Sequence, residues 1–301
     1  MRHLRYLHYV DAVARAGSIR KAAEGLNVVS SALNRRILDI EDELGAPIFE
    51  RQPRGVRLTA AGELFLGYIR RSRQDLERVR SEIEDLASVR RGTARIAAVE
   101  AVASSFLGRV LADFHADYPR IGFVVSVVGA DQAVAAVTGD DAEIGFTFNP
   151  SPDPRFHALR RKPQRLCALM GRDHPLAGRA SIRLEECIGY PLAIPDPTLG
   201  GRNLLDQALT GSSLSLHPTI EANSFDLMIG FALATGGIAL QVEIGGAIPA
   251  RADALAVVPL EGKRLQGEVV LGVRRDRILP VGAAVLCETL VERMDALVRV
   301  R

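Results

Sequence analysis

The spacing of apolar residues changes near residue 90, and this change restricts the chain to folds with two different parts. Before it, apolar residues recur every three or four positions, as along one face of a helix. After it, short runs rich in β-branched residues alternate with helical stretches, which predicts an α/β domain with mainly parallel sheets. With 301 residues and 48% hydrophobic composition, both parts can have packed cores.

The beginning of the chain predicts three short helices. Leu7 and Val10 belong to the apolar face of a first helix, which ends at Gly17. Ser18 is placed to cap a second helix whose buried face is made of small alanines, and a third helix begins near Ser30. Two short helices joined by a tight turn are typical of a helix-turn-helix.

The third helix has a polar face with the chemistry that DNA bases require. Its apolar positions from Leu33 to Leu44 are spaced for burial, so the opposite face around Leu38 is left to solvent. Short hydroxyl and amide side chains approach base edges in the major groove, and arginine reaches guanine or phosphate. The residues with this chemistry are Ser30, Ser31, Asn34 and Arg35. An ordinary solvated helix face is the alternative.

A basic hairpin and a long helix follow the third helix. Two extended runs, Ile48 to Arg51 and Val56 to Leu58, are joined by a turn and predict a wing. The arginines expected at phosphates are Arg51, Arg54 and Arg57. The helix predicted from Ala60 to about Val89 has one apolar seam and no core of its own, so we expect it to pair with a second copy. A homodimer on a two-fold DNA site follows.

Charge and cysteine content agree with this interpretation. Residues 1–91 hold 17 Lys+Arg against 13 Asp+Glu, whereas the remainder holds 21 against 23. A basic N-terminal part suits contact with phosphate, although ordinary surface charge is an alternative. The cysteines, Cys167, Cys187 and Cys287, form no CxxC pair and predict no disulfide framework or zinc site. Without a signal-peptide or membrane-span pattern, we expect a cytoplasmic protein.

Residues 17–62 resemble the LysR-type transcriptional regulators. The segment GSIRKAAEGLNVVSSALNRRILDIEDELGAPIFERQPRGVRLTAAG keeps that family's order and spacing, and the resemblance continues through HADYP, HPLAG and GGIAL. It implies a DNA-binding transcriptional regulator rather than an enzyme, with the polar face of the third helix on DNA. Two departures concern this helix: Val29 stands where the family commonly has a serine, and Leu38 stands at an often polar position. Ser30 would therefore have to take over the cap of this helix.

The resemblance also implies the architecture of the whole chain. The expected fold class is α/β and multi-domain, with an N-terminal winged helix-turn-helix, a long linker helix and a C-terminal two-lobed, periplasmic-binding-protein-like effector domain. The expected limits are residues 1–58 for the DNA-binding domain, 59–90 for the linker (dimerisation) helix and 91–301 for the effector domain. Lobe I would take in about 91–161 and 266–301, and lobe II about 162–265. The chain would cross between the lobes near Arg161 and Leu265.

A small-molecule effector is expected between the lobes, beyond the carboxyl ends of the strands. Where relatives that bind carboxylates often have small hydroxyl residues, this chain has Glu100 and Asp131. Two carboxylates would repel an organic acid and favour a cationic or hydroxyl-rich ligand, unless these side chains point to solvent or cap a helix. The effector-binding candidates are Glu100, Ala101, Val102, Asp131, Gln132, Phe148, Asp196, Thr198, Asn223, Ser224 and Gln241.

We expect no cofactor and no metal, because no histidine spacing, nucleotide loop or nucleophile motif points to one. The expected partners are double-stranded DNA, an unidentified effector, RNA polymerase, and further copies of the chain in a homodimer or homotetramer. Two other classes stay open: a solute-binding or receptor protein without DNA function, and an α/β enzyme that uses Glu100 or Asp131 as acid or base. Activation and repression are both compatible with the sequence.

Overall fold

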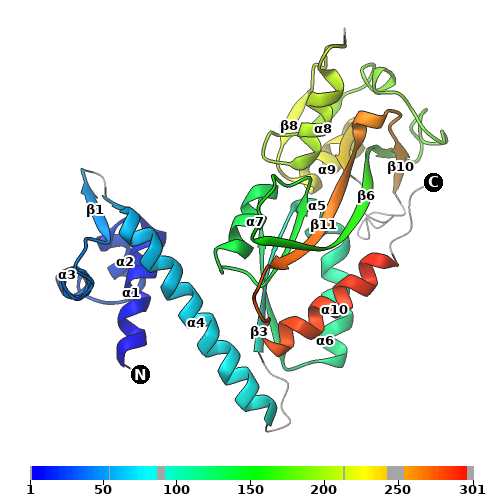
Figure 1. Ribbon diagram of the computed structural model, residues 1–301. Helices are drawn as coiled ribbons and strands as arrows, with labels where there is room; N and C mark the ends of the chain where they lie inside the picture. Colours follow the sequence, from blue (N-terminus) through cyan, green and yellow to red (C-terminus); the bar gives the residue numbers. More distant parts are fainter. Residues whose placement is uncertain (1, 54, 87–91, 213, 243–253, 297–301) are drawn as a thin grey trace. The chain divides into compact units, whose positions relative to one another are not determined.

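The computed structural model describes residues 2–53, 55–86, 92–212, 214–242 and 254–296. The chain divides into two compact units, Met1–Ile83 and Glu84–Arg301 (Figure 1). Among the described helices, none combines the length and the apolar character that crossing a membrane requires.

The first unit is a winged helix-turn-helix followed by a long helix, as predicted. Its elements are α1 (Arg2–Ala16), α2 (Ile19–Gly25), α3 (Ser30–Leu44), β1 (Phe49–Gln52), β2 (Gly55–Leu58) and α4 (Ala60–Leu86). β1 and β2 pair antiparallel and form the wing. The long helix was predicted to reach about Val89, and the part of that range after Leu86 lies outside the described residues.

Local signals fix where these helices begin and end. Gly17 and Gly45 follow α1 and α3 with φ of 60° and 71°, a left-handed conformation that glycine adopts without strain. Ser18 caps α2 as predicted, because its Oγ accepts the Lys21 N–H at 3.4 Å. The cap of α4 is equally local, with a threonine hydroxyl at residue 59 accepting the N–H three residues later at 2.9 Å.

The start of α3 has no such cap. Val29 is the N-cap residue and makes no side-chain hydrogen bond, while Ser30 is already the first helical residue. Ser30 therefore does not take over the missing cap, because a capping side chain has to project from the non-helical residue before the helix.

One apolar core holds the first unit together. It contains Leu7, Val10, Val13, Ala22, Ala23, Leu33, Ile37, Ile48, Phe49 and Ile69. Ile69 belongs to α4, so the first turns of the long helix are part of this core. Leu44 was predicted to be buried but is 41% exposed, because the last turn of α3 borders an open pocket.

The second unit alternates strands and helices. Its strands are β3 (Gly92–Ala98), β4 (Ile121–Val127), β5 (Ile144–Phe148), β6 (Phe156–Gly171), β7 (Leu192–Pro195), β8 (Ile220–Ala222), β9 (Ile238–Val242), β10 (Leu255–Pro259) and β11 (Gln266–Arg274). Its α-helices are α5 (Glu100–Val102), α6 (Gly108–Asp117), α7 (Ala130–Thr138), α8 (Gly200–Leu209), α9 (Phe225–Thr235) and α10 (Val281–Asp295). A π-helical turn, Ala103–Leu107, joins α5 to α6.

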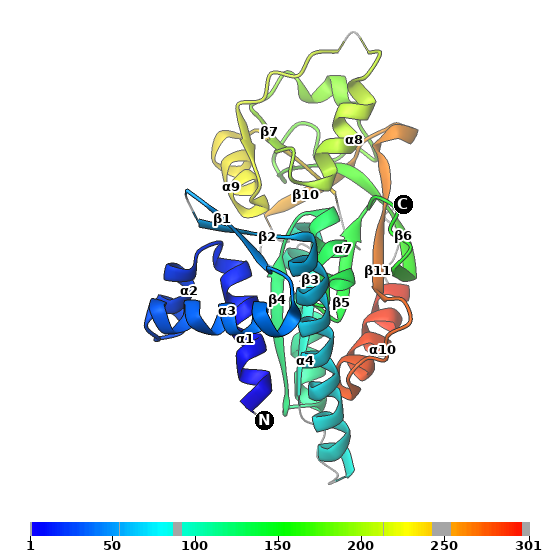
Figure 2. The same ribbon diagram turned by 60° about the vertical axis from the view of Figure 1, so that its left-hand side comes forward.

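Two lobes share the long strand β6. In lobe I the strand order is β4-β3-β5-β11-β6, and in lobe II β6 lies between β10 and β9, followed by β7 and β8. β6 pairs with β11 up to Arg165 and with β9 from Leu166 onward, so it passes from one lobe to the other there. β11 begins at Gln266 and brings the chain back to lobe I (Figures 1 and 2).

The expectation of mainly parallel sheets was wrong. The β3–β4, β3–β5, β7–β8 and β7–β9 pairs are parallel, but every pair made by β6 or β11 is antiparallel. The reason is the crossing of the chain between lobes: β6 leaves lobe I and β11 returns to it in the opposite direction. The sheet is therefore mixed.

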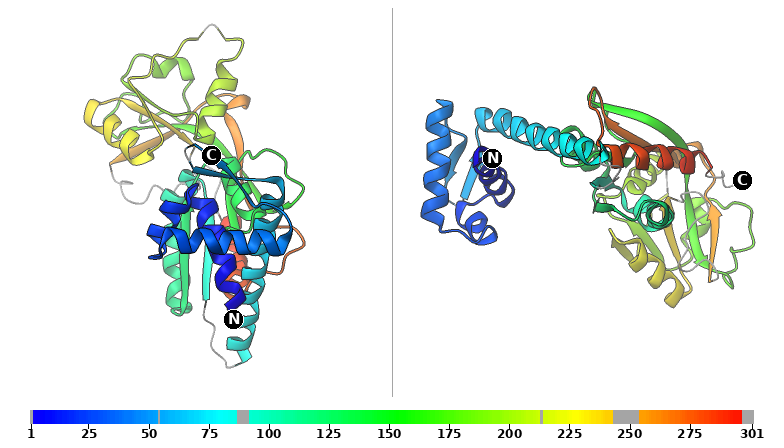
Figure 3. Two further views of the ribbon diagram at one scale, coloured as in Figure 1. Left: turned by 90° about the vertical axis from the view of Figure 1, so that its left-hand side faces the viewer. Right: turned by 90° about the horizontal axis from the view of Figure 1, so that it is seen from below.

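Helices cover both faces of each lobe. In lobe I, α6 and α10 pack on the face that carries Ile96 and Ile121, and α7 packs on the face of Ala97 (Figures 1 and 3). In lobe II, α8 and α9 lie on opposite sides of β7 (Figure 2). One apolar core runs through both lobes, and a smaller cluster lies under α7.

Candidate DNA-binding surface and lobe junction

The exposed face of α3 presents the predicted DNA-binding side chains together. Ser31 and Arg35 are exposed, and Ser30 and Asn34 are half-buried. Leu33 and Ile37 on the opposite side are buried in the core, which fixes the rotation of the helix about its axis. The polar face is therefore directed outward by packing.

The wing contributes to the same surface. The Arg51 guanidinium on β1 donates a hydrogen bond from Nη2 to Asn34 Oδ1 at 2.9 Å, so predicted residues from two elements meet. Arg57 on β2 is exposed, and Arg54 lies outside the described residues. This grouping of amide, hydroxyl and guanidinium groups has the donors and acceptors that base edges and phosphates require.

Glu41 positions the wing against α3, a role that the sequence analysis missed. Its Oε1 accepts the backbone N–H groups of Ile48 and Phe49 at 2.7 and 3.0 Å, which ties the start of β1 to the helix. The acidic EDEL stretch of α3 contains this residue, but helical spacing alone does not show which of its carboxylates reaches a backbone donor.

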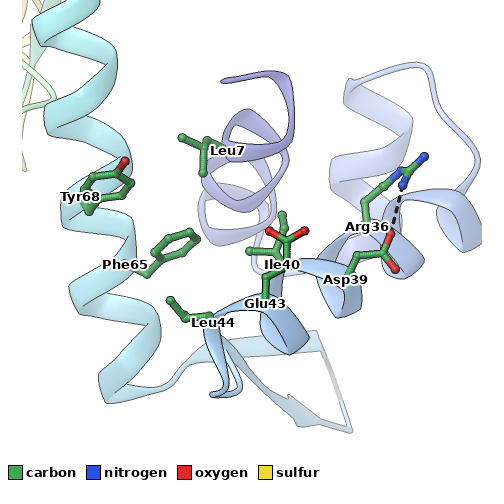
Figure 4. Close-up of a pocket in the computed structure, with 8 residues that line it drawn as sticks. All are labelled: Leu7, Arg36, Asp39, Ile40, Glu43, Leu44, Phe65 and Tyr68. Atoms are coloured by element: carbon green, nitrogen blue, oxygen red, sulfur yellow. Dashed lines mark hydrogen bonds and ion pairs between the residues drawn. The ribbon is translucent and has the colours of Figure 1, made fainter. Parts of the chain in front are cut away.

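A pocket of about 460 Å³ opens on another side of α3, between α1, α3 and α4 (Figure 4). It is lined by Leu7, Arg36, Asp39, Ile40, Glu43, Leu44, Phe65 and Tyr68. At 100° per residue, Ile40 and Leu44 point about 140° and 180° away from Arg35, whereas Asp39 points only about 40° away from it. The pocket therefore lies mainly on the side of α3 away from Ser31, and its edge at Asp39 adjoins Arg35.

The two lobes of the second unit meet at Glu100, the first residue of α5. The Glu100 carboxylate in lobe I lies near the Phe225 N–H at the start of α9 in lobe II, close enough for this N–H to affect its pKa. Burial raises the pKa of Glu100, and the nearby negative charge of Asp226 raises it further, while the Phe225 N–H acts in the opposite sense. The N-terminus of α9 thus lies beside two carboxylates, those of Glu100 and Asp226.

Close backbone and ring contacts also join the lobes. A Cβ added at Gly200, the first residue of α8, would lie 2.6 Å from Cδ1 of the buried Phe148 ring in lobe I. A Cβ added at Gly129 would lie 3.4 Å from the Thr198 carbonyl oxygen. The glycine at residue 200 is needed for this approach.

Several other effector-site candidates bond within their own lobes. Asp131 accepts both the N–H and the Oγ–H of Ser151, at 2.9 and 3.1 Å. Asp196 Oδ1 accepts the Thr198 N–H at 2.8 Å. Gln132 Oε1 accepts the N–H of the glycine three residues before it, and Ser224 caps α9. Of the two carboxylates singled out from sequence, Glu100 lies near groups of the other lobe, whereas Asp131 bonds to Ser151 in its own lobe.

The remaining candidates differ in exposure. Ala101 and Val102 are buried in the core, and Asn223 is exposed. Gln241 on β9 is buried, and its Oε1 has no hydrogen-bond partner among the described residues. Such an acceptor costs free energy unless a donor reaches it.

The three cysteines are buried, and none of them forms a disulfide within the described residues. Burial, with a smaller effect of nearby glutamates, raises the pKa of Cys187 to about 12 and that of Cys287 to about 11. Their thiols therefore stay protonated and unreactive near neutral pH. In the part of the chain that the structure describes, no three His, Cys, Asp or Glu side chains cluster as a metal site would require.

Comparison with known proteins assigns this architecture to a family. Residues 4–63 match the family model described as "Bacterial regulatory helix-turn-helix protein, lysR family", and residues 87–295, more than half of the chain, match "LysR substrate binding domain". The chain belongs to the LysR family of transcriptional regulators. The LysR family consists of DNA-binding regulators. Membership in this family therefore excludes the two other classes of protein that the sequence left open, an α/β enzyme and a solute-binding or receptor protein without DNA function.

Individual LysR-family relatives match most of the chain. A probable nitrogen assimilation transcriptional activator of Synechococcus elongatus is 30% identical over 221 residues, which are 71% of this chain and 70% of the relative. CbbR of Rhodospirillum rubrum is 26% identical over 286 residues, 95% of each protein.

Solved structures share the fold. Full-length OxyR of Pseudomonas aeruginosa superposes with a TM-score of 0.67 at 19% identity, covering 98% of this chain and 95% of that one. The complex of full-length CbnR with its target DNA superposes with a TM-score of 0.53 at 19% identity, covering 97% of this chain and 99% of that chain.

Proposed function

We propose that this LysR-family regulator binds a two-fold DNA site as a homodimer and that an effector at the lobe junction changes that binding. The observation that carries the DNA contact is the joint presentation of the α3 face and Arg51, held by the 2.9 Å bond to Asn34. The CbnR complex with target DNA, a protein of the same fold, supports this assignment. The DNA-contacting residues are Ser30, Ser31, Asn34, Arg35, Arg51, Arg54 and Arg57.

The proposed domains follow the course of the chain. Residues 1–58 would form the DNA-binding domain, residues 59–90 the linker helix through which two copies pair, and residues 91–301 the effector-binding domain. Within the last, lobe I would hold about 91–161 and 266–301, and lobe II about 162–265. The partner changes of β6 at Arg165 and the start of β11 at Gln266 support these limits. Binding to chromosomal DNA would place the protein in the cytoplasm.

The homodimer is proposed from exposed apolar residues on α4. Leu64, Tyr68 and Val79 are 78%, 46% and 41% exposed, and Tyr68 also lines the pocket beside α3. A long helix with such a face gains free energy when a second copy covers it. Pairing of dimers into a tetramer and contact with RNA polymerase are further proposals that follow the family.

The effector is proposed to be cationic or rich in hydroxyl groups. Glu100 and Asp226 place two carboxylates at the junction, and Glu100 lies beside the N–H group that an anionic ligand would use at the start of α9. An organic acid there would meet like charge. The residues proposed to contact the effector are the eleven named from the sequence: Glu100, Ala101, Val102, Asp131, Gln132, Phe148, Asp196, Thr198, Asn223, Ser224 and Gln241.

A footprint on the DNA upstream of the protein's own gene tests the DNA proposal. We expect protection of two related half-sites about one helical turn or a multiple of it apart, and no protection of scrambled DNA. A single protected half-site at all protein concentrations would contradict the two-fold mode, and no protection would contradict the site.

A thermal-shift comparison tests the effector class. Putrescine and glucosamine represent amines, and succinate and benzoate represent organic acids. We expect a member of the amine set to raise the melting temperature of the wild-type protein and both acids to leave it unchanged. Stabilisation by the acids alone would overturn the proposal, with sodium chloride at equal ionic strength as the control.

A further inference from the structure

Asp11 on α1 is the centre of a charge cluster that none of the DNA-binding or effector residues uses. Its side chain is only 4% exposed. Its Oδ2 lies 3.0 Å from Arg15 Nε and 3.5 Å from Arg73 Nη1, and its Oδ1 lies 3.5 Å from Arg70 Nε. One buried carboxylate therefore serves three guanidinium groups.

Two of these guanidinium groups come from α4. Arg70 and Arg73 lie one turn apart, so they face α1 from the same side of the long helix. Ile69, next to them, is buried in the same core as Val10 of α1. The ion pairs therefore continue the contact between α1 and α4 beyond the apolar core.

The arrangement depends on the charge of Asp11. The Arg70 and Arg73 side chains are 21% and 37% exposed, so they are partly withdrawn from water. An anion between partly desolvated guanidinium groups offsets their mutual repulsion. We expect that, without the Asp11 charge, the two arginines separate and hold this part of α4 less firmly against α1.

A change of angle at this point is amplified along the helix. The 13 residues from Arg73 to Leu86, the end of α4, span about 20 Å. A tilt of about 10° over that length displaces one end by about 3.5 Å, close to the rise of one base pair. A change of angle at the contact between α1 and α4 would therefore change the separation of the two DNA-reading heads of a dimer.

We propose that Asp11 is a positioning residue that fixes α4 to the DNA-binding head and so determines which half-site separation a dimer accepts. This inference rests on the proposed two-fold DNA binding. A purely structural role predicts a different result, because loss of head stability weakens binding to every DNA in the same proportion.

The test compares binding of the full chain to three kinds of DNA by fluorescence anisotropy. They are a single half-site, the natural two-fold site, and the two-fold site with about five base pairs, half a helical turn, inserted between half-sites. For Asp11→Asn we expect half-site affinity within about twofold of wild type. We also expect preference for the natural spacing to fall at least about fivefold; a change of that size is readily resolved in such assays.

Controls separate the inference from the function on which it rests. Asp113→Asn removes the same charge from an exposed 3.0 Å pair with Arg293 in the second unit and should change neither ratio. Arg73→Gln, which leaves Asp11 paired with Arg15, should reproduce part of the effect if Asp11→Asn does not fold.

The outcomes are distinct. Unchanged spacing preference in Asp11→Asn and Arg73→Gln, or equal loss on the half-site and the two-fold site, would overturn the role of Asp11. No spacing preference in the wild-type protein would instead contradict the proposed two-fold binding, and with it the premise of the inference.

Discussion

Glu100 is the residue whose ionisation bears most directly on the lobe junction. Because burial and Asp226 raise its pKa, the ionised form is disfavoured in the folded chain relative to the unfolded one. The stabilising contribution is therefore present while Glu100 is protonated and is lost as pH rises through its raised pKa. Glu100→Gln keeps an acceptor for the Phe225 N–H and removes the charge.

We expect Glu100→Gln to melt at a higher temperature than wild type at pH 8. The difference should shrink as pH is lowered through the acid range where Glu100 takes up its proton. Differential scanning calorimetry from pH 5 to pH 8 measures it, with Glu288→Gln, at an exposed position of α10, as the matched control. A constant difference at every pH would show that the Glu100 charge is not responsible.

The direction of the α3 side chains can be predicted from the sequence, whereas the direction of the side chains at the lobe junction cannot. The face of Ser31 and Arg35 follows from helical period, since Leu33 and Ile37 must be buried. Glu100 and Asp131 look alike at two strand ends, yet Glu100 lies beside the Phe225 N–H of lobe II, whereas Asp131 bonds to Ser151 in its own lobe. Only the packing of the lobes distinguishes them.

At the scale of the element, α3 begins without the cap that most helices have. Val29 has φ −74° and ψ 133°, the backbone conformation of an N-cap, and its side chain is 70% exposed. A serine there can accept a backbone N–H of the first turn without losing buried contacts.

We expect Val29→Ser to stabilise the first unit by about 1 kcal/mol, the usual contribution of an N-cap side chain. Urea denaturation followed by circular dichroism measures the change. Val29→Ala removes the same apolar group but supplies no acceptor, so it should give no gain. Equal stabilisation by alanine and serine would contradict the capping explanation.

Strand β6 shows why some strands cannot be predicted from the sequence. The apolar run RLCALM, residues 165–170, predicts only the end of this strand, which spans Phe156–Gly171. The rest is exposed or half-buried and rich in charge, and it is a strand because β11 pairs with it. The sequence pattern predicts no strand at β8 or β10, because short strands depend on their partners more than on their own residues.

At the scale of the whole second unit, the approach of the lobes depends on a missing side chain. Gly200→Ala would bring a methyl group to 2.6 Å from the Phe148 ring, so the ring or α8 must move. We expect a loss of about 1–3 kcal/mol in the stability of this unit, the usual cost of overpacking.

A double-mutant cycle measures whether Phe148 causes that loss. In a Phe148→Ala background, Gly200→Ala should cost clearly less, because the clashing ring is gone. Gly178→Ala, where an added Cβ meets nothing within 4 Å, is the control and should be close to neutral. Additive effects of the two substitutions would contradict the contact.

The central claim is that the exposed face of α3 reads DNA sequence, and one binding measurement tests it most directly. Fluorescence anisotropy over a salt series compares the DNA upstream of the protein's own gene with scrambled DNA, for wild type and Arg35→Ala. We predict tighter wild-type binding to the upstream DNA, with affinity falling steeply as salt rises.

Arg35→Ala should weaken binding to the upstream DNA by about 1–3 kcal/mol and binding to scrambled DNA much less. Equal loss on both DNAs would make Arg35 a phosphate contact. Wild-type binding that does not distinguish the two DNAs at any salt concentration would contradict the claim that this face reads sequence there.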